Sequence, residues 1–126
     1  MQNNKGYKRT ERVNSTLQRA VSEVLSQGVS DPALSAVIVM GVDVSPDLKN
    51  ATVYWYLAKE NDEERVATAK KALSRAVGRI RNQVASSVRM KVVPRLRFKY
   101  DDDINTRRHI ESLLDGLVPS DEESVD

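Results

Sequence analysis

The pattern of apolar and polar positions divides the chain into alternating helical and extended segments. Near the N-terminus, apolar side chains recur every three or four residues, as in one face of an amphipathic helix: Val13, Leu17, Val21, Val24 and Leu25. Gly28 is a suitable end for this helix, and Asp31-Pro32 supplies turn residues after it. Residues 1–10 are polar and basic, and we expect them to form a mobile arm outside the core.

Two segments rich in β-branched and aromatic residues follow. Residues 36–44 predict a strand with four apolar side chains on one face, namely Ile38, Met40, Val42 and Val44. Residues 52–57 predict a second strand with Val53, Trp55 and Leu57 toward the core, and with Tyr54 and Tyr56 exposed on the other face. The turn residues 45–50 join the two strands into an antiparallel hairpin.

A long amphipathic segment comes next. Asn61 is a suitable N-cap, with Glu64 completing a capping box, and the apolar stripe then contains Val66, Ala69, Leu73, Val77, Ile80, Val84 and Val88. A straight helix over residues 62–90 would be about 43 Å long, whereas a compact domain of this length is about 36 Å across. We therefore predict two helices that meet at Ala76-Val77-Gly78. The alternative is one helix that tolerates a single glycine.

The last regular pattern is a strict alternation after the helix-breaking Pro94. Residues 95–100 predict a third strand with Leu96, Phe98 and Tyr100 inward and with Arg95, Arg97 and Lys99 outward. A short amphipathic helix around 110–117 and an acidic tail follow. Helices on one face of a small mixed sheet define an α+β domain with two layers.

Composition excludes several functional classes. The 126 residues suit one domain, and they contain no cysteine and one histidine, His109, which excludes disulfides and thiolate metal sites. The longest apolar run is far shorter than the roughly 20 residues of a membrane span, and the N-terminus is unlike a secretory signal. We therefore expect a cytoplasmic protein without a membrane association.

The sequence also lacks the motifs of catalysis and phosphate binding. It contains no G-x-x-x-x-G-K-[ST], no G-x-G-x-x-G and no GxxG motif. Asp101-Asp102-Asp103 is the best candidate for a divalent cation, but adjacent aspartates more often form a solvated strand end. No nucleophile, base and orienting group come together, so we predict no enzyme activity, no metal and no cofactor.

Charge is strongly segregated along the chain. Residues 65–99 contain eleven Lys and Arg and no Asp or Glu, whereas residues 101–126 contain nine acidic and two basic side chains. Such a cationic block favours a polyanion, most often a nucleic acid; the alternatives are a basic surface balanced by the chain's own acidic tail, an acidic protein and a membrane surface. The candidate RNA-binding residues are Lys8, Arg9, Arg12, Lys71, Arg75, Arg79, Arg81, Arg89, Lys91, Arg95, Arg97 and Lys99.

Taken in order, these residues resemble the bacterial ribosome-binding factor A family over residues 7–117. The matching positions are Arg12-Val13, Asp31-Pro32, Val42-Asp43-Val44-Ser45, Asp47-Leu48, Ala76-x-Gly78, Ile80-Arg81, Arg89, Pro94, Leu96, Phe98 and Asp101. The chain departs from the family pattern at Arg95, where an acidic residue is frequent. The acidic tail after Leu117 matches no family feature.

The resemblance implies a type II KH-like domain of order α-β-β-α-α-β, with a kink at Ala76 and Gly78 between the second and third helices and a short C-terminal helix. Residues 1–9 would form a basic arm, 10–117 the RNA-binding domain and 118–126 an acidic disordered tail. It implies a monomeric, non-enzymatic factor that binds the free 30S subunit and 16S rRNA late in maturation, supports 16S rRNA 5′-end processing and growth in the cold, and is released with an assembly GTPase. The alternatives are a general RNA-binding KH-like module and a protein-interaction adaptor.

Overall fold

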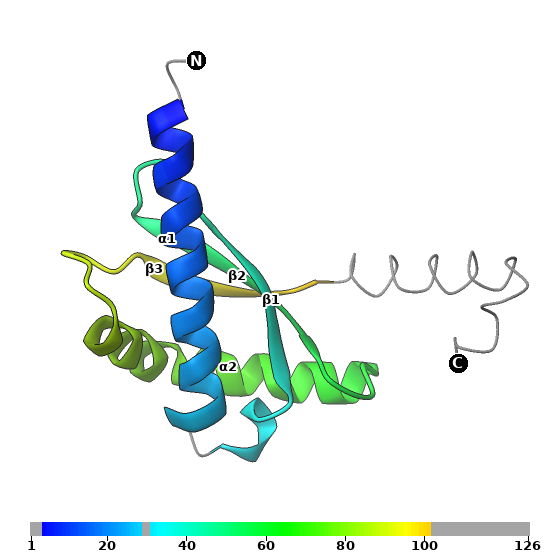
Figure 1. Cartoon of the computed structure of the whole chain (residues 1–126). Coiled ribbons are helices and arrows are strands. Elements are labelled where there is room, and N and C mark those ends of the chain that lie inside the picture. Colours follow the sequence, from blue (N-terminus) through cyan, green and yellow to red (C-terminus); the bar gives the residue numbers. More distant parts are fainter. Residues whose placement is uncertain (1–3, 29–30, 102–126) are drawn as a thin grey trace, which may run out of the picture.

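The computed structural model describes residues 4–28 and 31–101, with side chains from residue 9 onward except Gly28. The elements in order are α1 (Asn4–Glu23), a π-helical turn (Val24–Gly28), a 3-10 helix (Pro32–Leu34), β1 (Val37–Val44), β2 (Asn50–Leu57), α2 (Glu63–Ser87) and β3 (Arg95–Tyr100) (Figure 1). The described part of the chain is therefore a mixed α+β domain with two α-helices and a three-stranded sheet, which confirms the predicted class.

The sheet has the strand order β1-β2-β3. β1 and β2 are antiparallel, whereas β2 and β3 run parallel in a register from Asn50 opposite Arg95 to Trp55 opposite Tyr100. The parallel pair requires a crossover connection, which α2 provides. The third strand has the predicted bounds, and its outward cations are exposed.

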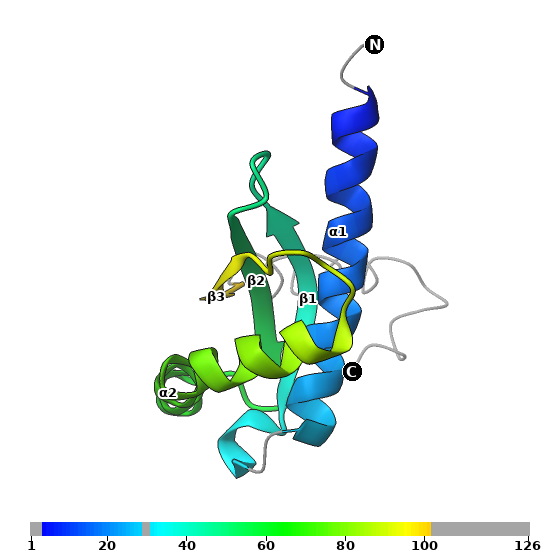
Figure 2. The same ribbon diagram turned by 90° about the vertical axis from the view of Figure 1, so that its left-hand side faces the viewer.

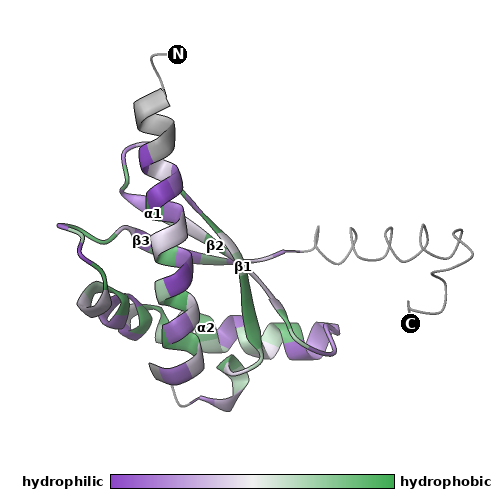
Figure 3. Ribbon diagram, viewed as in Figure 1, coloured by the Kyte–Doolittle hydropathy of each residue, from purple (hydrophilic) through white to green (hydrophobic). Residues whose placement is uncertain are grey.

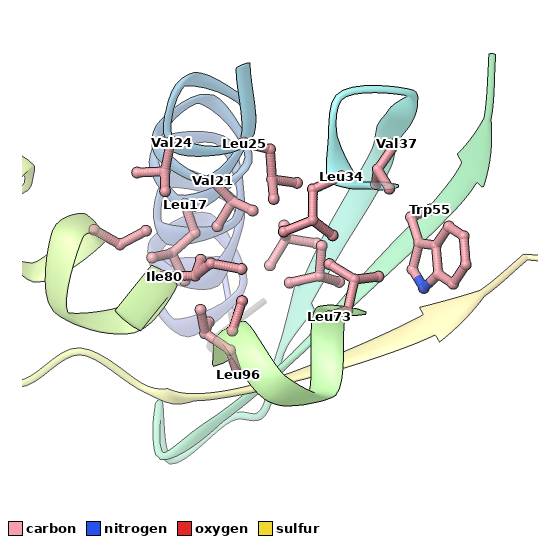
Figure 4. Packing of buried hydrophobic residues seen from close by; sticks show 14 of the residues in the cluster. Leu17, Val21, Val24, Leu25, Leu34, Val37, Trp55, Leu73, Ile80 and Leu96 are labelled. Carbon is pink, nitrogen blue, oxygen red and sulfur yellow. The ribbon is translucent and has the colours of Figure 1, made fainter. Parts of the chain in front are cut away.

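One hydrophobic core joins both helices to one face of the sheet (Figure 4). Leu17 of α1, Trp55 of β2, and Leu73 and Ile80 of α2 are at most 1% exposed. Hydrophilic and hydrophobic residues alternate in bands along both helices (Figure 3), as expected for amphipathic helices that bury one stripe each.

A β-bulge in β1 makes part of the predicted strand face wrong. Val39 pairs with Trp55 and Gly41 pairs with Tyr54, so Met40 is an extra residue without a partner of its own. One inserted residue reverses the alternation. Val37 and Val42 therefore share the buried face, while Ile38, predicted to face inward, is 38% exposed.

The outer face of the sheet corrects a second expectation. Tyr54 is half-buried, but Tyr56, predicted to be exposed, is only 7% exposed. Tyr56 lies opposite Ile38 in the antiparallel pair, so the two side chains are neighbours on the outer face. This cross-strand contact covers part of each side chain, although Ile38 remains 38% exposed.

The first helix starts earlier than predicted. It begins at Asn4, so most of the expected arm continues the helix α1 as far as Glu23 (Figure 1). This segment lacks an apolar stripe, which is why periodicity missed it. Its lysines and arginines are good helix formers, and it contains no proline, so it can extend the amphipathic part. The helical structure does end at Gly28, as expected.

The predicted pair of helices is also wrong, because α2 is a single helix from Glu63 to Ser87. Figures 1 and 2 show that it bends: its first half runs across Figure 1 and its second half is seen end-on, while Figure 2 shows the reverse. A straight helix of this length would span about 37 Å, about the expected width of the whole domain, and the bend lets it fit. Gly78 does not have a positive φ, so the chain bends without a break there.

The start of α2 differs by one residue from the prediction. Asp62 is the N-cap, and its Oδ1 accepts a hydrogen bond from the backbone N–H of Arg65 at 2.8 Å. Asn61 instead exchanges two hydrogen bonds with the backbone of Leu57, both at 2.9 Å. The expected C-terminal helix and acidic tail lie outside the described residues.

Candidate nucleic-acid interface

The outer face of α2 carries the first group of candidate cations. Lys71, Arg75 and Arg79 follow at intervals of four residues, and this spacing places them on one face of the helix. All three are exposed, whereas Leu73 and Ala76 between them are buried. Within residues 4–28 and 31–101, these three cations make no ion pair or side-chain hydrogen bond. They are therefore available to an external anion.

A groove between α2 and β3 holds the second group. It has a volume of about 1000 Å³ and is lined by all six residues of β3. Arg95, Arg97 and Lys99 contribute exposed cations from the strand, and Lys70 contributes one from the helix. No Asp or Glu lines this groove among the described residues. The tertiary structure thus brings together cations that are 25 or more positions apart in the sequence.

Arg81 has a structural role. Its Nε donates to the carbonyl of Pro94 at 3.1 Å, and its Nη2 donates to the carbonyl of Val93 at 2.5 Å. These bonds attach α2 to the segment that leads into β3. The guanidinium is half-buried and engaged, so we leave Arg81 out of the proposed interface.

The remaining predicted cations lie elsewhere on the domain. Arg9 and Arg12 are exposed on α1, and Arg89 and Lys91 are exposed in the segment between α2 and β3. The side chain of Lys8 lies outside the described side chains. The structure therefore distributes the predicted residues over several elements instead of joining them in one site. The outer face of α2 and the α2–β3 groove are the two places where several of them share one surface.

Lys70 is the residue that sequence reasoning missed. It lies at the border of the apolar stripe, one position before Lys71. The helical wheel therefore placed it clearly on neither the buried nor the exposed face of the helix. Its position against β3 depends on the parallel pairing of β2 with β3, which no local pattern fixes. The sequence feature that could have pointed to Lys70 as a binding residue is its place in segment 65–99, which contains no Asp or Glu.

The described residues offer little for other classes of site. No group of three or more His, Cys, Asp or Glu that could hold a metal ion occurs in that part of the chain. No helix there has both the length and the apolar character needed to cross a membrane. The ion pairs of the same part join Arg65 to Glu60 at 2.9 Å and to Asp62 at 3.4 Å, at the start of α2.

The fold and the surface thus define a small α+β domain with a cationic surface suited to a polyanion. Comparison with known proteins gives the family. The model of the family "Ribosome-binding factor A" matches residues 9–114. The chain is 37% identical to ribosome-binding factor A of Chromohalobacter salexigens over 115 residues, which cover 91% of this chain and 88% of the relative. The chain belongs to the ribosome-binding factor A family.

Solved structures agree with this assignment. The crystal structure of ribosome-binding factor A from Thermus thermophilus has 35% sequence identity and a TM-score of 0.62, covering 72% of this chain and 93% of that one. A homology model of the Thermus thermophilus protein, fitted into the cryo-EM map of its complex with 30S, has 36% identity and a TM-score of 0.56. That match covers 68% of this chain and 88% of the other. The confirmed family was the one that the sequence resembled.

Proposed function

We propose that this protein is a ribosome assembly factor that binds the free 30S subunit through 16S rRNA during late maturation. The observation that carries the proposal is family membership over most of the chain, together with the relative fitted into the map of a 30S complex at 36% identity. The protein acts by binding and not by catalysis. In this role it supports 16S rRNA 5′-end processing and growth in the cold, and it leaves the subunit with the help of an assembly GTPase.

We assign the RNA contact to the outer face of α2. Three exposed cations in line, without carboxylate partners among the described residues, match the repeating charge of a phosphate backbone. Arg9, Arg12, Arg89 and Lys91 add positive charge from neighbouring parts of the chain, and the cations of β3 form the second candidate surface. Lys8 belongs to the same proposal by its place in the sequence.

The domain is, in this proposal, a variant of the type II KH-like fold. Its element order supports this assignment, with the bent α2 in place of two separate helices. Ala76 is buried and Gly78 is exposed at the middle of α2, where we place the kink. The protein acts as a cytoplasmic monomer composed of the domain, whose helix α1 includes most of the basic arm, and the acidic tail predicted from the sequence.

Sedimentation through a sucrose gradient tests the function. Purified protein mixed with 30S and 70S particles is expected to co-sediment with 30S and not with 70S. The variant Lys71→Glu/Arg75→Glu/Arg79→Glu is expected to stay folded by circular dichroism, because exposed charges contribute little to stability, and to lose co-sedimentation. Equal association with all RNA-containing particles would favour the alternative, a general RNA-binding module.

A matched control separates the site from the overall charge. The variant Arg19→Glu/Lys49→Glu/Lys59→Glu removes three cations outside the interface and changes the net charge by the same amount. We expect it to keep most of the 30S binding. If the α2 variant binds like the wild type, the variant Arg95→Glu/Arg97→Glu/Lys99→Glu locates the contact on β3.

A further inference from the structure

The two edges of the sheet are protected differently. β1 forms one edge, and α1 covers it with two side-chain hydrogen bonds: Asn14 Oδ1 accepts from the N–H of Val44 at 2.9 Å, and Gln18 Nε2 donates to the carbonyl of Met40 at 3.3 Å. β3 forms the other edge of the described sheet. Unpaired edges are templates for pairing with another strand, and no strand of residues 4–28 and 31–101 pairs with the outer edge of β3.

The register shows which backbone groups of β3 point outward. The N–H of Arg95 donates to Lys49 and the N–H of Asp101 donates to Trp55, both at 2.9 Å. In a parallel pair every second residue bonds to the neighbouring strand. Leu96 and Phe98 therefore direct their N–H and C=O groups away from β2, and no hydrogen bond joins these groups to any other described residue.

The groove beside α2 runs along this edge. All six residues of β3 line the groove, together with Asn50, Ala51, Thr52 and Trp55 of β2. Because successive side chains of a strand point to opposite faces, lining by six consecutive residues fits a groove that reaches the edge of β3. Apolar side chains of α2, Leu73 and Val77, form one wall. The exposed cations Arg95, Arg97 and Lys99 border the other side.

We propose that the edge of β3 binds an extended acidic peptide segment of a partner protein, which adds to the sheet as a fourth strand. The peptide backbone pairs with Leu96 and Phe98. Acidic side chains on one face of the added strand lie beside the cations of β3, and small apolar side chains on the other face pack against the half-buried Val77 and Phe98. The ligand is thus a strand with alternating acidic and apolar residues.

The chemistry of the edge favours a peptide over an RNA backbone. Leu96 and Phe98 each present both a donor and an acceptor. An RNA backbone supplies phosphate acceptors, with the ribose 2′-hydroxyl as its donor, and its phosphates would place negative charge beside the outward carbonyls. A peptide strand supplies donors and acceptors at the same two-residue repeat, about 6.6 Å. This inference concerns a surface different from the outer face of α2 and does not depend on the proposed RNA contact.

Amide hydrogen exchange of the full-length protein tests the proposal. The probe is an acetylated and amidated octapeptide, Thr-Glu-Val-Glu-Val-Glu-Val-Thr. Its binding is expected to slow exchange at the amides of Leu96 and Phe98, and to leave the amides of Arg97 and Lys99, which already bond to β2, unchanged. A peptide N-methylated at the pairing residues is expected to bind roughly tenfold more weakly or worse, because the backbone bonds are lost. A Lys-for-Glu peptide is expected not to bind.

Control variants and competitors make the result decisive. Arg97→Glu is expected to weaken peptide binding, whereas the matched change Arg75→Glu on the outer face of α2 is expected to leave it intact. Failure of the peptide to bind, or equal binding of the N-methylated peptide, would overturn the proposal. Protection of Leu96 and Phe98 by an octauridylate but not by the peptide would assign the groove to RNA. Failure of the peptide to bind leaves the sedimentation test of the outer face of α2 unchanged, whereas protection by the octauridylate would support the second candidate RNA surface on β3.

Discussion

Arg81 of α2 holds the segment before β3 through its hydrogen bonds to the carbonyls of Pro94 and Val93. Both acceptor residues are buried, so removing the guanidinium leaves two carbonyls without their charged donors. We expect Arg81→Ala to lower the free energy of unfolding by about 3 kcal/mol, since hydrogen bonds to charged groups contribute more than neutral ones. Urea denaturation measures this effect.

The neighbouring Arg79 provides the control for this experiment. It is exposed and makes no side-chain hydrogen bond within the described residues, so Arg79→Ala should change stability by about 0.5 kcal/mol or less. Arg81→Lys should recover only part of the loss, because an ammonium group lacks the planar fork of the guanidinium. Equal stability of Arg81→Ala and Arg79→Ala would contradict the structural role.

Asn61 connects the ends of two strands at the start of α2. Its Oδ1 accepts from the N–H of Leu57 and from the hydroxyl of Tyr100 at 3.0 Å, while its Nδ2 donates to the carbonyl of Leu57. Loss of all three bonds in Asn61→Ala should cost about 2 to 4 kcal/mol of unfolding free energy. The loss should exceed that of the N-cap change Asp62→Ala, about 1 kcal/mol, in thermal or urea denaturation. A larger effect for Asp62→Ala would contradict this ranking.

Gly78 provides a test of how the bend in α2 is made. Its φ is not positive, and a Cβ built on it meets no atom within 4 Å. Gly78→Ala should therefore stabilise the protein by about 1 kcal/mol through helix propensity. Gly78→Pro should destabilise it by about 3 kcal/mol or more, because proline removes a helical donor and clashes with the preceding turn. Destabilisation by alanine would show that the bend needs glycine.

The parts of the fold that the sequence predicted are those fixed by local periodicity. The alternation over residues 95–100 defined β3, and its outward cations are exposed as expected. The bulge at Met40 escaped prediction because it depends on how β1 aligns with β2. Asn61 is engaged by Leu57 and by Tyr100, which is 39 positions away, and Asp62 is the cap instead. The place of Lys70 in the groove also escaped prediction, because the residues that line the groove with it belong to β3.

The turn between β1 and β2 contains a carboxylate, Asp47, whose hydrogen bonds make the stability of the turn depend on pH. Asp47 Oδ1 accepts hydrogen bonds from Ser45 Oγ at 2.6 Å and from the N–H of Lys49 at 3.0 Å. These bonds favour the charged form and lower the pKa of Asp47 from its usual 3.8. The turn is thus stabilised above the unfolded pKa, and the stabilisation is lost as the pH falls through the folded pKa.

Carbon-detected NMR titration measures this effect directly. The carboxyl of Asp47 should titrate with a pKa below 3.8 in the wild type and closer to 3.8 in Ser45→Ala, since the largest cause of the shift is then removed. A pKa of Asp47 that does not respond to Ser45→Ala would contradict the assignment of the shift to the hydroxyl.

The salt dependence of 30S or rRNA binding tests whether phosphate neutralisation is the main source of affinity. If roughly six phosphates are neutralised by the cations of α2 and its neighbours, affinity should fall about a thousandfold between 50 and 200 mM salt, because counterions are released on binding. The neutral variant Lys71→Gln/Arg75→Gln/Arg79→Gln should reduce the slope of log affinity against log salt by about 3, one for each lost contact. The same changes at Arg19, Lys49 and Lys59 should leave the slope unchanged. A flat response in the wild type would mean that the exposed cations of α2 do not contact phosphate.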